Sequence, residues 1–339
     1  MPEGISALSR TQIGLEAVAG SSTDIPTTIW RGTGGMKDNL RVVFPTEKIG
    51  ILGGTTRAYI PETGGETALE GIATFEQLPY IFQSGIKTVV GTTDAGSGIT
   101  WTWAVQQGSS DPISTTDLST MVIEDGDNIQ AEIAHYGFVR EFTLTGSAGE
   151  ALEVSATVQH RAPAVATFTS GLTVPTVEDI LFSLGSLYID DTTGTIGTTV
   201  VSTTLLDMSL KMTTGWTAKK AKDNRTDFSF IKRADDEIML DVTFEHNSIA
   251  VAEKAAWRAK TERALRMTFL GTGLTTTGGT YDTKAFVVNL YGIWETFGAA
   301  GLEETDGNNV YKGTFRARYS PTATAKASFV VVNQLATLP

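Results

Sequence analysis

Residues 237–258 read EIMLDVTFEHNSIAVAEKAAWR and show both secondary-structure periods in succession. From Glu237 to Glu245 polar and apolar residues alternate strictly, which is typical of a strand with one buried face. Asn247 or Ser248 can then cap a helix in which apolar residues recur every three to four positions. The stretch therefore predicts a strand that leads directly into a short helix.

Residues 66–82 show the same arrangement about half a chain earlier. The extended stretch ETALEGI is followed by Thr74 and Gln77 at the spacing of a capping box, and Pro79 starts the helix one turn late or kinks it. Few residues are identical between the two stretches. We interpret the pair as a duplication, and the alternative is that a common junction occurred twice by chance.

Composition bounds the fold class. The chain has 339 residues, 41% of them hydrophobic, which suits about two domains with real cores. It is rich in Thr and Gly, and Gly, Asp and Asn separate short alternating runs, so we expect mostly β structure. The absence of cysteine excludes disulfides and thiolate metal sites. Because no long apolar segment occurs, we expect neither a signal peptide nor a membrane span, and synthesis in a cytosol.

The net charge of -12 is unevenly distributed along the chain. Residues 51–200 carry 18 acidic and 4 basic side chains, whereas residues 201–339 carry 15 acidic and 17 basic ones. An acidic surface repels phosphate, so we do not expect tight binding of nucleic acid. Such a surface could instead form a wall past which nucleic acid slides.

We expect two tandem domains, 1–165 and 186–339, joined by a linker at 166–185 that contains a short helix from Val177 to Leu184. The clearest hairpin pairs residues 138–145 with 151–158. Each domain also contains a long polar loop at an equivalent position, 45–63 in the first and 213–226 in the second. Loops of this length inside a compact domain are usually functional or disordered. The predicted fold class is mostly β with minor α.

The sequence gives almost no support for an enzyme. His135, His160 and His246 have no metal-binding spacing, and no nucleophile elbow, phosphate loop or dinucleotide motif occurs. The acidic run at 124–128 is too short for a calcium loop and is typical of a hairpin turn. We therefore expect no catalytic, metal or cofactor site, and a β-rich enzyme is the weakest interpretation.

Two groups of charged residues suggest binding surfaces. The second long loop and its exit carry a basic cluster: Lys219, Lys220, Lys222, Arg225, Lys232 and Arg233. This cluster is either a solvated loop or a surface that meets acidic residues of a neighbouring copy, for which Glu124, Asp125 and Asp127 are candidates. Contacts between unlike patches on identical chains build open fibres or tubes. The second group lies on the polar faces of the strands that precede each helix. These faces either form a binding surface or merely face bulk water, and their acidic residues are Glu66, Glu70, Glu237, Asp241 and Glu245.

Several short segments resemble the tail tube proteins, or major tail proteins, of long-tailed bacteriophages (siphophages). They are residues 10–16, followed by a Gly, Ser and Thr-rich arm that ends at 26–28, and residues 30–36, 73–79, 142–151 and 175–182. The resemblance spans most of the chain but is carried by small motifs. It implies two tandem β-sandwich domains, each flanked by a short helix, whose inner sheets join those of neighbours into a continuous barrel around a channel for DNA.

The resemblance also implies an assembly. Tubes of this family are stacks of hexameric rings, so a chain with two tube domains would form an equivalent ring from three copies. The long loops would reach the adjacent ring, with Glu47, Lys48 and Arg57 as candidate contacts in the first loop, and the N-terminal arm would make another inter-ring contact. Glu237, Asp241 or Glu245 would include lumen-facing members. The basic second loop departs from the nearly neutral first loop, which puts strict equivalence of the six positions in doubt.

The implied setting is the virion, with assembly in the host cytoplasm. The implied partners are further copies of the chain, a tape measure protein inside the tube, terminator and distal tail proteins at its ends, and viral DNA in transit. No membrane is involved. The alternative is a hexameric ring in which one half of the chain is a tube domain and the other an outward decoration or host-surface-binding domain.

Overall fold

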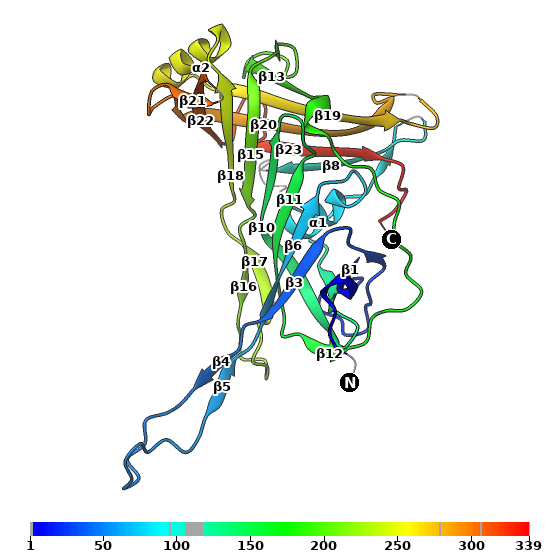
Figure 1. The fold of residues 1–339 in the computed structure, drawn as a ribbon, viewed down its shortest axis with the longest axis vertical. Helices are drawn as coiled ribbons and strands as arrows, with labels where there is room; N and C mark the ends of the chain where they lie inside the picture. The colour runs from blue at the N-terminus through cyan, green and yellow to red at the C-terminus, as the bar shows by residue number, and fades with distance from the viewer. Residues whose placement is uncertain (1–2, 95, 106–117, 278, 306, 339) are drawn as a thin grey trace.

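A computed structural model of the protein describes residues 3–94, 96–105, 118–277, 279–305 and 307–338. Strands dominate, and the described residues contain two α-helices, α1 (Leu78–Gly85) and α2 (Ser248–Ala259). The fold class is therefore confirmed as mostly β with minor α. Figure 1 shows an elongated molecule with a hairpin projecting from one end and α2 at the other.

A long antiparallel sheet runs through both halves of the chain (Figure 1). β10 (Ala131–Ser147) pairs with β15 (Leu205–Thr213) from Glu141 opposite Thr213 to Ser147 opposite Asp207, and this pairing joins the halves. In order, the sheet contains β3 (Thr33–Asp38), β6 (Gly65–Ile72), β11 (Glu153–His160), β10, β15, β18 (Glu237–Glu245), β22 (Asn308–Ala317) and the end of β20 (Thr283–Phe297). We call these eight strands the central sheet.

The second half repeats the strand order of the first. In the central sheet, the order β3-β6-β11-β10 of the first half corresponds to β15-β18-β22-β20 of the second. Outside it, the first half carries β9 (Met121–Gly126), β1 (Arg10–Leu15), β2 (Thr28–Ile29) and β12 (Ala164–Ala166) around the start of β10. The second half carries β19 (Arg263–Gly273), β13 (Gly185–Asp191), β14 (Val200–Val201) and β23 (Ala327–Asn333) around the start of β20.

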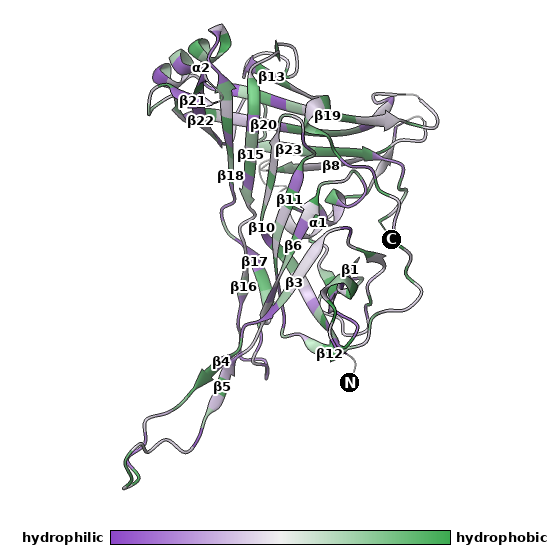
Figure 2. Cartoon of the chain, viewed as in Figure 1, coloured by the Kyte–Doolittle hydropathy of each residue, from purple (hydrophilic) through white to green (hydrophobic). Residues whose placement is uncertain are grey.

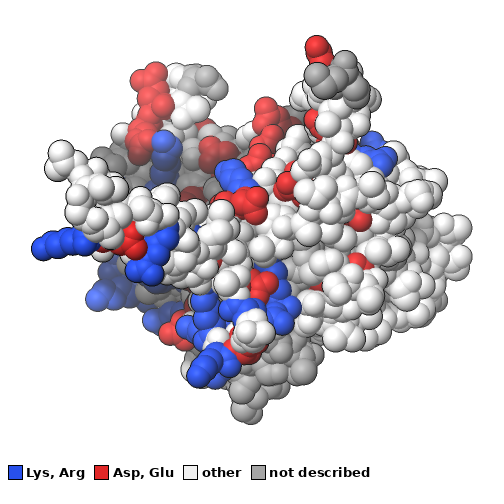
Figure 3. Space-filling view, turned by 90° about the horizontal axis from the view of Figure 1, so that it is seen from below, with Lys and Arg blue, Asp and Glu red and all other residues white. Residues whose placement is uncertain are grey.

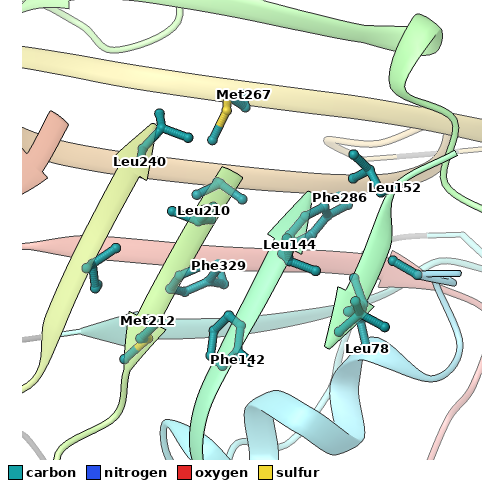
Figure 4. Close-up of a cluster of buried hydrophobic side chains, with 14 of the residues drawn as sticks. Leu78, Phe142, Leu144, Leu152, Leu210, Met212, Leu240, Met267, Phe286 and Phe329 are labelled. Atoms are coloured by element: carbon teal, nitrogen blue, oxygen red, sulfur yellow. The ribbon is translucent and has the colours of Figure 1, made fainter. Parts of the chain in front are cut away.

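One strand pair breaks this correspondence. β8 (Ile99–Val105), with the short β7 (Thr92–Thr93), comes from the first half but pairs with β23 of the second. The core is likewise continuous, since Phe82 of α1 contacts the rings of Phe142, Phe286 and Phe329 from both halves. Figure 4 shows Phe142, Phe286 and Phe329 among buried side chains that come from strands of both halves. The halves therefore fold around one shared core.

Both predicted strand-to-helix junctions are present. The Asn247 side chain accepts hydrogen bonds from the backbone N–H groups of Ile249 and Ala250 at 3.0 Å, so Asn247 caps α2. In the first junction the hydroxyl of Thr74 accepts from the N–H of Gln77 at 3.2 Å, and α1 begins at Leu78 with a proline in its first turn. This late start is one of the two outcomes that the proline predicted.

The predicted helix from Val177 to Leu184 is wrong. Residues 177–181 are extended and lie against the edge of the first half, with bridges from Asp179 to Thr74 and from Leu181 to Ala151. Their backbone groups are satisfied there, and only a three-residue 3-10 helix, Phe182–Leu184, follows. A second 3-10 helix, Ser6–Leu8, precedes β1. A neighbouring strand edge thus outweighed the local capping signal.

The two long polar loops are both hairpins, but only the second packs on the body of the protein. The first contains β4 (Arg41–Val43) and β5 (Tyr59–Glu62) and projects far from the body, as Figure 1 shows. The second contains β16 (Trp216–Lys219) and β17 (Phe230–Arg233), whose Trp216, Phe228 and Ile231 pack on Tyr136 and Phe138. The short β21 (Glu303–Thr305) pairs with β22 and completes the fold.

Candidate assembly surfaces

One face of the central sheet packs on the core, and the opposite face is polar. Strand register brings seven carboxylates onto the polar face: Glu66, Glu70, Glu141, Glu153, Asp207, Glu237 and Asp241. It brings four cations there: Lys37, Lys211, Lys312 and Arg316. Since residues directly opposite each other on neighbouring strands share a face, this surface is continuous across both halves and net acidic.

Some of these charges are paired across strands. Lys211 lies 2.9 Å from Glu141, Arg316 pairs with Glu237, and Asp241 accepts a hydrogen bond from the Thr314 hydroxyl. Among the residues that the structure describes, Glu70, Glu153 and Asp207 take part in no ion pair. The unpaired carboxylates give the face its negative potential.

The five acidic residues predicted from the strands before the helices lie on this face or at its end. Glu66 and Glu237 lie on it at the starts of β6 and β18, Glu70 and Asp241 lie further along these strands, and Glu245 lies at the end of β18 next to α2. Sequence reasoning placed them in two separate domains, and the structure brings them onto one surface. The sequence analysis did not assign Glu141, Glu153 and Asp207 to this surface. The alternation of Glu153, Ser155 and Thr157 with apolar residues could have placed Glu153 on the polar face.

The central sheet has two strand edges without a partner in the described residues. β3 pairs with β6 on one side only, and the last residues of β20, from Ile293 to Phe297, have β22 as their one strand partner. On this stretch of β20 the indole N–H of Trp257 in α2 donates to the carbonyl of Glu295 at 3.0 Å. Among the described strands the pairings do not return to their starting strand, so the sheet that they form is open. Open edges of this kind readily pair with another chain.

The basic cluster is less free than its sequence suggests. Lys220 lies 2.8 Å from Glu62 at the root of the projecting hairpin, and Arg225 lies 3.4 Å from Asp223. The Arg233 side chain is 7% exposed and faces Asp236 at 3.7 Å, so it is not a surface contact. Lys219, Lys222 and Lys232 stay exposed. Figure 3, seen from this end, shows positive side chains gathered on one side.

The acidic candidates for the basic cluster have roles inside the chain. Glu124 is 2% exposed and accepts hydrogen bonds from the backbone N–H and hydroxyl of Thr169. Asp125 accepts from the Thr11 hydroxyl and the Met36 N–H, and Asp127 caps the turn that follows it. Glu124 therefore fixes the segment at Thr169 against β9, Asp125 ties β9 to β1 and β3, and Asp127 shapes the β9–β10 turn.

The predicted contacts of the first loop lie near the tip of the projecting hairpin. Glu47 accepts hydrogen bonds from the N–H and hydroxyl of Thr56 and pairs with Arg57 at 2.5 Å. These hydrogen bonds from Thr56 lower the pKa of Glu47. Lys48 is exposed beside them. The charged residues thus hold the tip in shape, and apolar side chains occupy the surface around them.

Two other kinds of site were looked for among the described residues. No group of three or more His, Asp or Glu side chains there could hold a metal ion. No helix among those residues is long and apolar enough to cross a membrane. No protein-family model matches this sequence, and no curated protein gives a significant match to it.

Proposed function

We propose that the protein is the structural subunit of a phage tail tube, in which three copies close a ring and stacked rings enclose a channel for DNA. The observation that carries this proposal is the junction of β10 with β15. That junction joins the fourth strand of the first four-strand unit to the first strand of the second. The free end of β20 and the free edge of β3 are the matching edges for the same junction between two copies.

Strand direction is compatible with closure. All eight strands of the central sheet are antiparallel to their neighbours, so the two outermost strands run in opposite directions. The β20 edge of one copy can therefore pair antiparallel with the β3 edge of the next. Eight strands from each of three chains would give a barrel of 24 strands with no free edge.

The register shift between the units also suits a barrel. Arg140 in β10 and Glu295 in β20 are single-residue bulges at matching positions of the two four-strand units. When the units are aligned on these bulges, the strand pairings make Gly34 of β3 equivalent to Met208 of β15. Followed across the strands, however, Gly34 leads to Met212, four residues beyond Met208. A shift of four residues over four strands is one residue per strand. Closed barrels with eight strands and a total shift of eight residues have the same ratio, and their strands tilt by about 36°.

Electrostatics supports the passage of DNA. With a strand spacing of about 4.8 Å and this tilt, 24 strands would enclose a channel roughly 45 Å across between backbones. The helices α1 and α2 and the rest of the core cover one face of the central sheet, so that face cannot line a channel. The opposite face, which is polar and net acidic, would therefore line the lumen. Carboxylates such as Glu70 and Glu153 would repel phosphate over a range of about 10 Å at 0.1 M salt.

The resemblance of residues 10–16, 30–36 and 73–79 to tail tube proteins supports the same function. On that basis the further partners would be a tape measure protein in the lumen, and terminator and distal tail proteins at the ends. The alternative, a hexameric ring with one tube domain and one outward host-binding domain, is less favoured. A chain with only one tube domain would not need one sheet that continues from β10 of the first half into β15 of the second.

Paired cysteines test the ring directly, because the natural chain has none. Aligned on the bulges, Thr296 of one copy should lie opposite Asn39 of the next, as Glu141 lies opposite Thr213 within a chain. On oxidation, Thr296→Cys with Asn39→Cys should give covalent species that stop at three chains. Glu141→Cys with Thr213→Cys is the matched control and should close within a single chain.

Two outcomes would count against the proposal. A ladder that stops at six chains would contradict the three-copy ring. Absence of any cross-link between chains, while the control pair oxidises fully, would contradict the pairing of β20 with β3. Non-reducing gel electrophoresis with mass photometry separates these cases.

A further inference from the structure

Both open edges of the central sheet carry a hydrogen bond from a side chain of the same chain. On β20, the indole N–H of Trp257 in α2 donates to the backbone carbonyl of Glu295 at 3.0 Å. On β3, the backbone N–H of Met36 donates to the carboxylate of Asp125 in β9 at 3.1 Å. A side-chain donor thus covers a backbone acceptor on one edge, and a side-chain acceptor covers a backbone donor on the other. We call these two contacts the edge caps.

The internal junction of β10 with β15 shows what the capped carbonyl would bind in a ring. Glu295 corresponds to Arg140, since both are the bulges of their four-strand units. The carbonyl of Arg140 accepts from the N–H of Thr214 at 2.9 Å and from the Thr214 hydroxyl at 3.0 Å. The indole of Trp257 therefore binds, at Glu295, the atom that a residue of the neighbouring strand binds at Arg140.

The capped N–H of Met36 faces the outer side of β3. The N–H of Asn39, three residues along, donates to the residue before β6, and N–H groups of successive strand residues point to opposite sides. The equivalent of Met36 in β15 is Leu210, which lies opposite Leu144 of β10. Because a backbone N–H carries one hydrogen, Met36 cannot make a full hydrogen bond to Asp125 and to an incoming strand at once.

The two helices differ where they meet the sheet edge. In the first half α1 ends at Gly85, where a Cβ would lie 3.4 Å from the methyl carbon of Thr214, so glycine leaves room for the neighbouring strand. In the second half α2 has 12 residues against 8 in α1, and its last turn brings Trp257 to the edge of β20. The buried Glu253 of α2 also accepts from the indole N–H of Trp294 in β20 at 2.7 Å. This second contact fixes α2 to the sheet without Trp257.

We propose that the edge caps slow ring closure, because both must open before β20 of one copy pairs with β3 of the next. The inference rests on the proposed ring and concerns its regulation. Figure 2 shows β3 mostly in pale colours of intermediate hydropathy, so backbone hydrogen bonds carry most of its attraction for another strand. Proteins commonly block such edges against uncontrolled pairing. An incoming strand can replace both caps, since its own N–H and C=O groups satisfy Glu295 and Met36.

Trp257→Phe tests the cap on β20, because it removes the N–H and keeps an aromatic ring on the helix. Single chains of this variant should form rings roughly fivefold faster than the unchanged protein, as expected for the loss of one hydrogen bond. Trp30→Phe is the matched control, because the Trp30 indole also donates to a backbone carbonyl, that of Glu70 in the interior strand β6, at 3.2 Å. It should leave the rate unchanged. Mass photometry over time measures ring formation.

Asp125→Ala tests the cap on β3. Its control is Thr11→Val, which removes the other hydrogen bond of this carboxylate, from the Thr11 hydroxyl at 2.7 Å, and leaves the one from Met36. Hydrogen exchange at the Met36 N–H in the single chain should speed up in Asp125→Ala and not in Thr11→Val. Combining Trp257→Phe with Asp125→Ala should multiply the two gains in rate, since the caps lie on different edges.

The outcomes separate the caps from the tube. Unchanged or slower ring formation in both cap variants, while the unchanged protein forms rings, would overturn the inference and leave the tube proposal standing. Equal acceleration by the caps and their controls would also overturn it, since general loosening would then explain the gain. Absence of rings from both the unchanged protein and the double variant would overturn the tube proposal itself. Trp257→Phe keeps the packing of the ring against the core, so it decides the question even where Asp125→Ala does not fold.

Discussion

Asp190 orders the loop between β13 and β14. Its carboxylate accepts hydrogen bonds from the N–H groups of Gly197, Thr198 and Thr199 and from the Thr198 hydroxyl, at 2.6 to 3.1 Å. Burial raises the pKa of Asp190, but the hydrogen bonds from Thr198, Thr199 and Gly197 outweigh it and lower the pKa to about 2. This carboxylate therefore stabilises the β13–β14 loop as an anion.

We predict an acid-sensitive contribution from Asp190. Since its folded pKa lies below its ordinary value of 3.8, the contribution is fully present above about pH 4 and is lost as the pH falls through 2. Asp190→Asn should lower the free energy of unfolding by about 2 kcal/mol at pH 7 and by much less at pH 2. Urea unfolding at both pH values measures this, and an equal loss at both would contradict the account.

Lys284 joins the two halves through ion pairs. Its ammonium lies 2.6 Å from Glu76, just before α1, and 3.0 Å from Glu178 in the linker. Burial alone would lower the pKa of Lys284, but its hydrogen bonds to both carboxylates raise it above the ordinary value. The pairs are mostly hidden from water, so removing the cation leaves two carboxylates without a counter-charge.

Lys284→Met should therefore lower the free energy of unfolding by about 3 kcal/mol. The matched control is Lys211→Met, because the Lys211–Glu141 pair is about half exposed on the polar face and should contribute less than about 1 kcal/mol. Chemical unfolding of both variants measures the difference. Equal losses for the two lysines would show that the buried pairs have no special role.

At the scale of elements, strands with a strict period could be predicted from the sequence. The stretch that contains β18 and α2 carries its own alternation and its own cap at Asn247, so local signals decided it. The same holds for β6, for the late start of α1 at Pro79 and for the β10–β11 hairpin. The acidic residues of β6 and β18 were assigned correctly to polar faces for the same reason.

Partner choice over long separations could not be predicted. The pairing of β10 with β15 joins residues about 60 to 70 positions apart, and that of β8 with β23 joins the first half to the end of the chain. Alternation tells which face is buried but not which strand lies alongside. The second hairpin folds back because Trp216 and Phe228 contact Tyr136, which is distant in the sequence. The capping residues at 176–179 wrongly suggested a helix, because the segment pairs with distant backbone instead.

The projecting hairpin should be dispensable for the stability of the single chain. None of its side chains between Phe44 and Ala58 belongs to the buried clusters, so its removal exposes no core. Replacing residues 44–58 by a short Gly-rich turn should change the thermal midpoint by no more than a few degrees, because loop length has a small effect on stability. Calorimetry measures this, and a large drop would mean that the hairpin supports the fold.

For the whole molecule, the acidic face should keep DNA from adhering. Glu70→Lys, Glu153→Lys and Asp207→Lys together should leave the strands intact, since all three side chains point away from the core. Tubes of this variant should retain DNA at low salt and release it as salt rises. A control with the same net charge, Glu3→Lys, Asp179→Lys and Asp282→Lys, lies outside the central sheet. Equal retention by both would contradict a lumen lined by the acidic face.

Closure of the sheet between copies is the claim on which the other proposals depend. Electron microscopy of the purified protein tests it most directly, because averaged end views give the number of chains per ring. We predict hollow, striated tubes whose rings contain three chains and a continuous inner wall of strands. Particles that stay single at every concentration, or rings whose inner wall is interrupted between chains, would contradict the account.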